Sequence, residues 1–328
     1  MKKEVRFSFV SLGIFFLTVS LALASEKKDL KFASDWVFHG GYAPFFVALE
    51  KGHYTERGLK VSVERGYGAA DGIKRLLGGA NDLIFGDSGA AILARADGAK
   101  VKLTGLIYEK APFVIYSLKK SGITEPKHLE GKKIATNAGD ANYLLFPALA
   151  RATGIDAKKI SWVTVSPPQK IPVLMAEKVA AMTLFVISEP IVAQQAAKLG
   201  GYNRILYADY GVDIYSNGIT ALDKFIAENP GSVRGFVQGT VKAYEYSFAH
   251  LDEAVRIILK YQPHLEPGIS RASLEAVKAV VLTPAAKANG VGWVVEEKMR
   301  RTRDIILSAY GKTAQVSLQD IYTNQFLR

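Results

Sequence analysis

The chain has 328 residues, of which 49% are hydrophobic and 22% are charged, and it contains no cysteine. This length is too great for one simple core and predicts roughly two lobes, while the lack of cysteine excludes disulfides and thiol chemistry. The formal net charge is +11, but the basic pairs lack the interleaved aromatic residues that stack bases, so we expect no nucleic-acid partner.

Residues 1–24 predict a secretory signal peptide. Three basic residues near the start precede an uncharged apolar run from Phe7 to Ala24, and small residues before Ser25 form a cleavage site. A membrane anchor is the alternative, but the run contains several serines and is at the short end of what spans a bilayer. Because no cysteine is present to carry a lipid, we expect the exported protein to be freely soluble in a periplasm. We also expect it to be a monomer.

From Leu30 onward, short apolar runs alternate with helical patterns, which is typical of open, mostly parallel α/β sheets. The expected strands are 30–33, 59–64, 83–85 and 101–107, and the expected helices are 43–52, 70–77 and 88–96. A fifth extended segment at 113–118 leaves this lobe toward a linker at Pro126. We therefore assign residues 25–118 to a first lobe.

After Gly131 the same alternation begins again. Strands are expected at 134–135, 160–165 and 182–185, and helices at 143–153, 171–176 and 191–199. The chain then crosses back at 215–220, and the remainder is expected to be helical at 223–228, 233–249, 251–261, 270–279 and 295–309. We assign residues 119–214 to a second lobe and 215–328 to the first, so that two crossings form a two-stranded hinge.

Loops at the carboxyl ends of strands are where open α/β sheets bind ligands. The loop after the first expected strand supplies four candidate ligand-binding residues, Asp35, Trp36, His39 and Tyr42. They are typical of a stacking and hydrogen-bonding wall, and the alternative is that the loop packs its Trp on the lobe. The loop after the third strand adds Asp87 and Ser88, where Ser88 as a helix cap is the alternative.

The second lobe and the return crossing supply the other candidates, Asn137, Asp140, Tyr143, Glu189 and Asn217. An anion is expected at a helix start with free N–H groups, and here an aspartate occupies that start. Carboxylates favour a ligand that donates hydrogen bonds, such as an amino-substituted heterocycle, although Asp140 has the alternative of capping its own helix. Residues 166–170 are expected to form a rigid turn.

No pattern in the sequence predicts a metal ion, a cofactor or a catalytic residue. The histidines at 39, 53, 128, 250 and 264 have no partner at the spacing of a zinc site. Gly66–Ala70 lacks the third glycine of a dinucleotide-binding loop. The sequence around Ser88 is similar to the nucleophile loop of trypsin-like serine proteases. A strand-to-helix turn without a paired histidine does not support that chemistry.

Residues 42–61, with the Asp-Trp pair before them, resemble the thiamine-pyrimidine superfamily of type II periplasmic binding proteins. Residues 129–134 and 189–193 are also similar, and the resemblance covers most of residues 30–255. It implies an α/β fold of two doubly wound lobes joined by a two-stranded hinge. It also implies the solute-binding component of an ABC importer, which closes on a thiamine pyrimidine precursor and docks on an inner-membrane permease. A sulfonate, nitrate or an aromatic acid is the alternative ligand.

The same superfamily includes fungal synthases that make the thiamine pyrimidine from pyridoxal phosphate and an active-site histidine. The resemblance places their cofactor lysine and their histidine in the stretch at 86–91, where this chain has neither, and it has no cysteine-rich segment. We therefore expect a binding protein without a cofactor, not an enzyme. A sensory or scaffold protein that has kept the fold is a third alternative.

Overall fold

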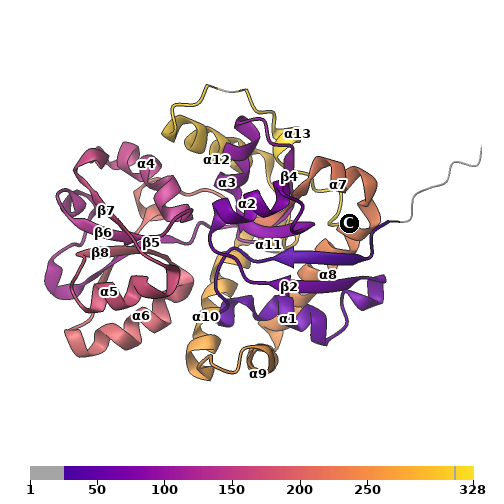
Figure 1. The fold of residues 1–328 in the computed structure, drawn as a ribbon, viewed down its shortest axis with the longest axis horizontal. Helices are drawn as coiled ribbons and strands as arrows, with labels where there is room; N and C mark the ends of the chain where they lie inside the picture. The colour runs from indigo at the N-terminus through magenta and orange to yellow at the C-terminus, as the bar shows by residue number, and fades with distance from the viewer. Residues whose placement is uncertain (1–25, 314) are drawn as a thin grey trace, which may run out of the picture.

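The computed structural model describes residues 26–313 and 315–328, which form two α/β lobes lying side by side (Figure 1). The expected signal peptide at 1–24 lies outside the described residues. Within the described part of the chain, no helix is long and apolar enough to cross a membrane.

The first lobe is built on a five-stranded sheet of order β2-β1-β3-β10-β4. β1 is parallel to β2 and β3, whereas β10 is antiparallel to β3 and β4. The strands are β1 (Asp29–Ala33), β2 (Lys60–Glu64), β3 (Leu83–Asp87), β4 (Val101–Leu106) and β10 (Asn217–Leu222). The intervening helices are α1 (Ala43–Glu50), α2 (Ala69–Leu77) and α3 (Ser88–Ala96).

The second lobe repeats this plan with a sheet of order β7-β6-β8-β5-β9. β6 is parallel to β7 and β8, and β5 is antiparallel to β8 and β9. The strands are β5 (Phe113–Leu118), β6 (Lys133–Thr136), β7 (Ser161–Thr164), β8 (Ala181–Phe185) and β9 (Tyr202–Leu206). The helices are α4 (Ala141–Thr153), α5 (Lys170–Met175) and α6 (Glu189–Ala196).

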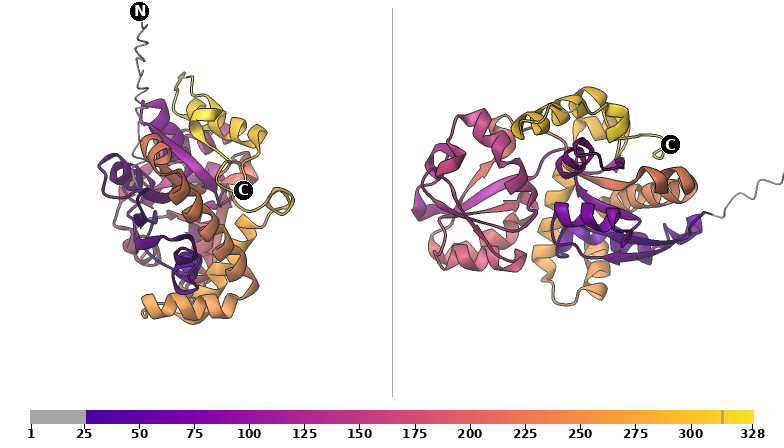
Figure 2. Two further views of the ribbon diagram at one scale, coloured as in Figure 1. Left: turned by 90° about the vertical axis from the view of Figure 1, so that its right-hand side faces the viewer. Right: turned by 45° about the horizontal axis from the view of Figure 1, so that its top comes forward.

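The C-terminal part of the chain is helical, as the sequence predicts. Its helices are α7 (Asp223–Glu228), α8 (Pro230–Ala249), α9 (Leu251–Tyr261), α10 (Pro267–Val281), α11 (Pro284–Asn289), α12 (Glu296–Ala309) and α13 (Leu318–Ile321). α8 and α9 pack against α1 of the first lobe. α9 buries Ala254, Val255, Ile257 and Ile258, which share one face of the helix. α12 instead contacts both α3 and α4, and Figure 2 shows it above the junction of the lobes.

The boundary expected at residue 118 needs correction, because β5 pairs in the second sheet. Phe113–Leu118 is buried along its whole length and has a hydrogen-bonded neighbour on each edge, β8 and β9. A strand buried on both faces has to complete its backbone hydrogen bonds within one sheet, which places it inside the second lobe. The first crossing therefore lies at 107–112, between β4 and β5.

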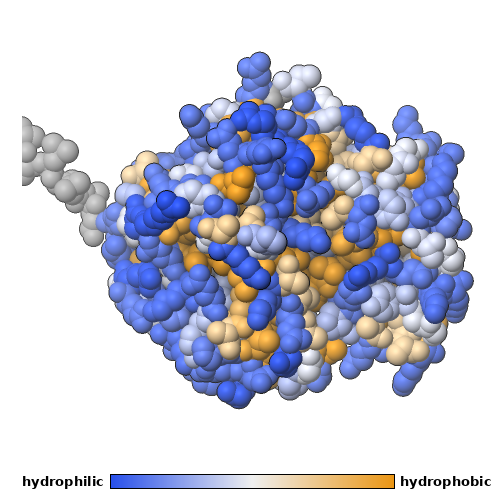
Figure 3. All heavy atoms as spheres, turned by 180° about the vertical axis from the view of Figure 1, so that it is seen from behind, coloured by the Kyte–Doolittle hydropathy of each residue, from blue (hydrophilic) through white to orange (hydrophobic). Residues whose placement is uncertain are grey.

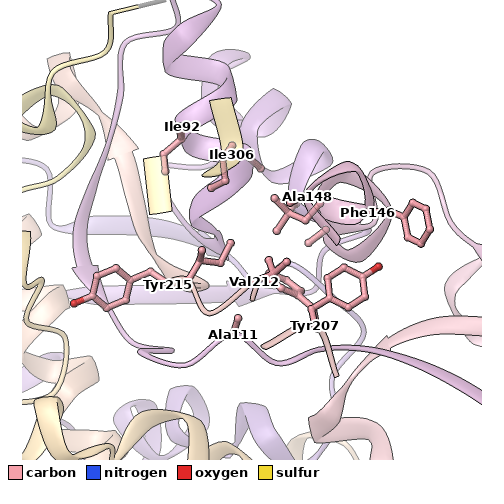
Figure 4. Close-up of a cluster of buried hydrophobic side chains, with 14 of the residues drawn as sticks. Ile92, Ala111, Phe146, Ala148, Tyr207, Val212, Tyr215 and Ile306 are labelled. Atoms are coloured by element: carbon pink, nitrogen blue, oxygen red, sulfur yellow. The ribbon is translucent and has the colours of Figure 1, made fainter. Parts of the chain in front are cut away.

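The two crossing segments are hydrogen-bonded to each other. The Tyr108 N–H donates to the Asn217 carbonyl (2.8 Å), and the Ser216 N–H donates to the Tyr108 carbonyl (3.1 Å). Beside them, one cluster of buried hydrophobic side chains joins the lobes through Ile92 of α3, Ile306 of α12 and Ala148 of α4 (Figure 4). The lobes are thus packed together on this side of the molecule.

Candidate ligand-binding site

A narrow cavity lies where the loops of the two sheets meet. It is lined from the first lobe by Asp35, Trp36, His39, Tyr42, Gly68 and Ala69, and from the second by Asp140, Ala141, Asn142, Lys170, Leu184, Phe185 and Ser188. Its volume is about 40 Å³. That is room for on the order of three water molecules, so the lobes are closed on each other around it.

Trp36 forms the apolar wall of the cavity on the first lobe. It follows β1 at the carboxyl end of the sheet, as the sequence predicts, and its side chain is half-buried. The Nζ of Lys170 lies over the indole, 5.1 Å from the ring centroid. Because Lys170 begins α5 in the other lobe, this contact bridges the two lobes. Figure 3 shows hydrophobic residues gathered where the lobes meet on the rear face of the molecule.

Asp35 is held as an acceptor by two buried donors. The Tyr42 hydroxyl donates to Oδ1 (2.8 Å), and the Asn217 amide donates to Oδ2 (2.7 Å). Burial raises the pKa of Asp35 to about 6, although both hydrogen bonds oppose that shift. Tyr42 lines the cavity, whereas Asn217 lies behind Asp35 and acts through it.

Asp87 and Ser88 lie behind the cavity wall and do not line it. Asp87 caps α3 by accepting from the Gly89 N–H (2.8 Å), and the Ser216 hydroxyl donates to its other oxygen (3.2 Å). Burial raises the pKa of Asp87 to about 7. The Ser88 hydroxyl donates to the Tyr215 carbonyl (3.0 Å). These two predicted site residues therefore support the helix and the hinge, and the residue that caps α3 is Asp87.

His39 contributes a neutral ring to the cavity. Its Nδ1 accepts a hydrogen bond from the Gly41 N–H (3.0 Å), so we assign the ring proton to Nε2. Burial lowers the pKa of His39 to about 4, which keeps the ring uncharged at neutral pH. Its ring centroid lies 4.6 Å from that of Tyr42. His39 therefore offers an N–H donor.

Asp140 takes the helix-cap role that the sequence left open as the alternative, and its oxygens already have partners within the protein. One oxygen accepts from the backbone and side-chain N–H groups of Asn142 (2.9 and 3.1 Å). The other accepts from Lys170 Nζ and Thr183 Oγ1, both at 2.5 Å. Burial opposes ionisation, but Lys170 and these donors lower the pKa of Asp140 below its ordinary value. Asp140 is thus a helix cap and the counter-ion of a buried lysine, not a free acceptor.

Lys170 was missed by the sequence interpretation, which assigned 166–170 to a turn. The turn is present at Pro167–Gln169 and is closed by a capping box between Ser166 and Gln169. Lys170 follows it and is only 1% exposed. It is the first residue of α5, which follows β7 and this turn, so the strand-end rule could have drawn attention to its position. Its Nζ also donates to the Asn137 Oδ1 (3.0 Å), which gives Asn137 an indirect place in the site.

Two predicted residues lie away from the cavity. Tyr143 is 41% exposed and packs edge-on against Trp162, with centroids 4.9 Å apart. Glu189 accepts from the Tyr202 hydroxyl (2.8 Å) and from Arg204 (2.6 Å). It lines a separate groove between the lobes, beside α10. Their positions after strands were inferred correctly, but their side chains turn to neighbours within the second lobe.

Two glycine loops meet across the mouth of the cleft. Gly68, before α2, has a φ of +127°, and a Cβ there would lie 3.0 Å from the carbonyl oxygen of Gly139. Gly139 precedes α4 in the second lobe. Side chains larger than hydrogen would hold these loops apart, so the contact belongs to the closed arrangement.

Among the residues that line the cavity there is no arginine, and its lysine is paired with Asp140. No group of three or more His, Asp or Glu residues that could hold a metal ion occurs in the described ranges. The cavity therefore offers aromatic side chains at Trp36, Tyr42 and Phe185, N–H donors at His39 and Lys170, and an acceptor at Asp35, with no uncompensated cation.

The NMT1/THI5-like family profile matches residues 40–254. The riboflavin-binding protein RibY of Chloroflexus aurantiacus is 25% identical, with 87% of this chain and 82% of that protein covered. The formylaminopyrimidine-binding protein of Halalkalibacterium halodurans is 21% identical over 78% of this chain and 77% of its own. A protein of Legionella pneumophila named as a hydroxymethylpyrimidine phosphate synthase is also 21% identical, over 75% of this chain and 77% of its own.

Solved structures share the fold. A protein of Bordetella bronchiseptica superposes with a TM-score of 0.74 at 19% identity, covering 92% of this chain and 96% of its own. The periplasmic aliphatic sulphonate binding protein of Escherichia coli gives a TM-score of 0.66 at 16% identity, covering 91% and 93%. The two sheets and their hinge are therefore those of a type II periplasmic binding fold, as expected from the sequence.

Proposed function

From the membership of this chain in the NMT1/THI5-like family, we propose that it is the solute-binding component of an ABC importer. Its ligand is a small neutral heterocycle such as a thiamine pyrimidine precursor, bound between the lobes by hinge closure. It acts in a periplasm after removal of its signal peptide and delivers the ligand to an inner-membrane permease.

The observation that carries this proposal is the composition of the cavity between the lobes. Trp36 supplies a face for a planar ring, and Asp35, His39 and Lys170 supply hydrogen-bonding groups from both lobes. A ligand that touches both walls stabilises the closed form, because the open form offers only one wall at a time. The relatives named for formylaminopyrimidine and for riboflavin both bind heterocycles, which supports this ligand class.

The charges around the cavity disfavour a sulfonate or nitrate. Lys170 is already neutralised by Asp140, and Asp35 carries no cationic partner among the described residues. An anion would enter beside a buried carboxylate without a free cation to balance it, which is costly in a low-dielectric site. A neutral ring that donates to Asp35 meets no such cost.

A pyridoxal-phosphate synthase is the alternative from another class, since some relatives carry that name. Burial lowers the pKa of the lysine in this cavity, and its ion pair with Asp140 at 2.5 Å opposes that shift. An aldimine would break this ion pair and leave the Asp140 carboxylate buried without its counter-ion, which is costly. The protein incubated with pyridoxal phosphate is expected to show no absorbance of a lysine aldimine. A stable aldimine band would favour the synthase.

Thermal unfolding with added compounds tests the proposed function, because any ligand of the native state raises the melting temperature. We expect a rise with hydroxymethylpyrimidine or formylaminopyrimidine that saturates with concentration. Riboflavin, taurine and nitrate are the comparison compounds. A shift with taurine or nitrate and none with a heterocycle would reject the proposed ligand class.

A further inference from the structure

The buried ammonium of Lys170 has one donor more than the acceptors it meets. A lysine ammonium carries three N–H groups. One donates to Asp140 Oδ2 (2.5 Å) and one to Asn137 Oδ1 (3.0 Å), both within the second lobe. The third N–H faces the Trp36 indole, whose ring centroid lies 5.1 Å from Nζ. The π face of the indole attracts the cation in place of a hydrogen-bond acceptor.

The cavity is too small for a ring unless the indole moves away from that ammonium. With a volume of about 40 Å³, the cavity has room for a few water molecules but not for a heterocycle. The ring that enters has to separate Trp36 from Lys170, since these two side chains face each other across the lobes. The third N–H of Lys170 then needs a new acceptor, because an unpaired buried donor on a charged group is costly.

We propose that Lys170 is the specificity-determining residue of the second lobe, and that its free N–H bonds an acceptor atom on the edge of a planar ligand stacked on Trp36. This inference rests on the proposed function and narrows its ligand class. The ligand is a neutral heterocycle that carries an acceptor, a ring nitrogen or a carbonyl oxygen, on one edge. On another edge it carries an N–H donor for Asp35. Asp140 and Asn137 are positioning residues that fix the direction of the ammonium.

The geometry explains why a lysine and not an arginine occupies this position. A guanidinium would form a planar, bidentate pair with Asp140. A tetrahedral ammonium instead donates to two acceptors in its own lobe and directs its third N–H toward the first lobe. The ion pair also cancels the charge of the lysine, so the site recognises an acceptor without attracting anions.

The test compares two ligands that differ only in ring acceptors. Hydroxymethylpyrimidine has two ring nitrogens, and (2-amino-4-methylphenyl)methanol replaces both with CH while keeping the amino, methyl and hydroxymethyl groups. Titration calorimetry of the wild type is expected to show at least tenfold tighter binding of the pyrimidine. The variant to compare is the double substitution Asp140→Asn with Lys170→Met. Lys170→Met alone would leave a buried carboxylate unpaired and endanger folding.

In the double variant we expect the preference for the pyrimidine to fall to about twofold or less. Lys51→Met is the control, because Lys51 also pairs with a carboxylate, Glu253, and lies 4.9 Å from an aromatic centroid, that of Tyr246. It is outside the cavity and should leave the preference unchanged. A double variant that binds with the wild-type preference would overturn this inference alone. A wild type that binds neither compound would overturn both the inference and the proposed function.

Discussion

Trp36 carries the apolar contact that we assign to the ligand. Removing the indole with Trp36→Ala is expected to weaken binding of hydroxymethylpyrimidine about 10- to 100-fold, since burial of a large apolar group contributes roughly 1.5–3 kcal/mol. Titration calorimetry gives this ratio. Trp293→Ala is the matched control, because Trp293 is also half-buried under a cation, Arg328, and does not line the cavity. Equal loss of affinity in both variants would contradict the role of Trp36.

Asp87 makes the stability of the protein depend on pH in a direction opposite to that of a salt-bridged carboxylate. Its pKa rises from 3.8 to about 7 on folding, so the native state binds more protons, and stability falls as pH increases from about 4 to 7. Asp87→Asn keeps the cap of α3 and removes this titration. Relative to the wild type, the variant should become more stable as pH rises through that window, by up to roughly 4 kcal/mol in the free energy of unfolding. Its melting temperature should therefore exceed that of the wild type.

Above pH 7 the difference between Asp87→Asn and the wild type should stay constant, because the native carboxyl is then ionised. Asp209→Asn, which changes an exposed carboxylate, is the control and should follow the wild type. Melting curves from pH 4 to 9 measure both. A constant difference over the whole range would show that Asp87 keeps an ordinary pKa in the folded protein.

The residues of the first loop were predictable because they are close in sequence. Asp35, Trp36, His39 and Tyr42 all follow one strand, and all four line the cavity. The position of Lys170 after β7 follows the same rule, but its pairing could not be recognised from local sequence, since it depends on a carboxylate 30 positions away. The cap at Asp140 was an alternative that the local sequence offered, whereas its neutralisation by Lys170 has no local pattern.

At the scale of elements, the loop before α2 contacts the loop before α4 so closely that only glycine fits at Gly68 in the closed form. Gly68→Ala would place a methyl group about 3.0 Å from the Gly139 carbonyl and hold the lobes apart. Binding of hydroxymethylpyrimidine should weaken about tenfold or more, and small-angle scattering should report a larger radius of gyration. The expected result has two causes, because Gly68 also has a φ of +127° that only glycine adopts readily.

Gly290→Ala separates these causes. Gly290 has a φ of +101° and nothing within 4 Å of its Cβ position. This control carries the same backbone strain without the contact between lobes, so it should lower stability and leave the scattering profile unchanged. An equal expansion in both variants would mean that strain and not the glycine contact controls closure.

The elements themselves were predictable where burial is strong and regular. The segments at 59–64, 88–96 and 251–261 form a strand or a helix at or within one residue of the expected bounds. β5 was recognised as extended but assigned to the wrong lobe, because a buried apolar strand has the same pattern in either sheet. β9 was not predicted, and its residues Tyr202–Leu206 are mostly half-exposed at the edge of the sheet.

For the whole molecule, the hinge and the cavity are connected by one hydrogen-bond network. The crossings pair through Tyr108, Ser216 and Asn217, and Asn217 also holds Asp35 at the cavity. A ligand bonded to Asp35 therefore contacts a network that continues into the hinge. α12 packs on α3 and α4 across the same junction, so this helix takes part in holding the lobes together.

The central claim is that these two lobes close on a small neutral heterocycle. Native mass spectrometry of the protein, mixed with equal concentrations of hydroxymethylpyrimidine, formylaminopyrimidine, riboflavin, taurine and nitrate, tests it most directly. We predict a single adduct of one pyrimidine per chain, which disappears in Trp36→Ala. An adduct of taurine or nitrate, or no adduct with any compound, would contradict the account.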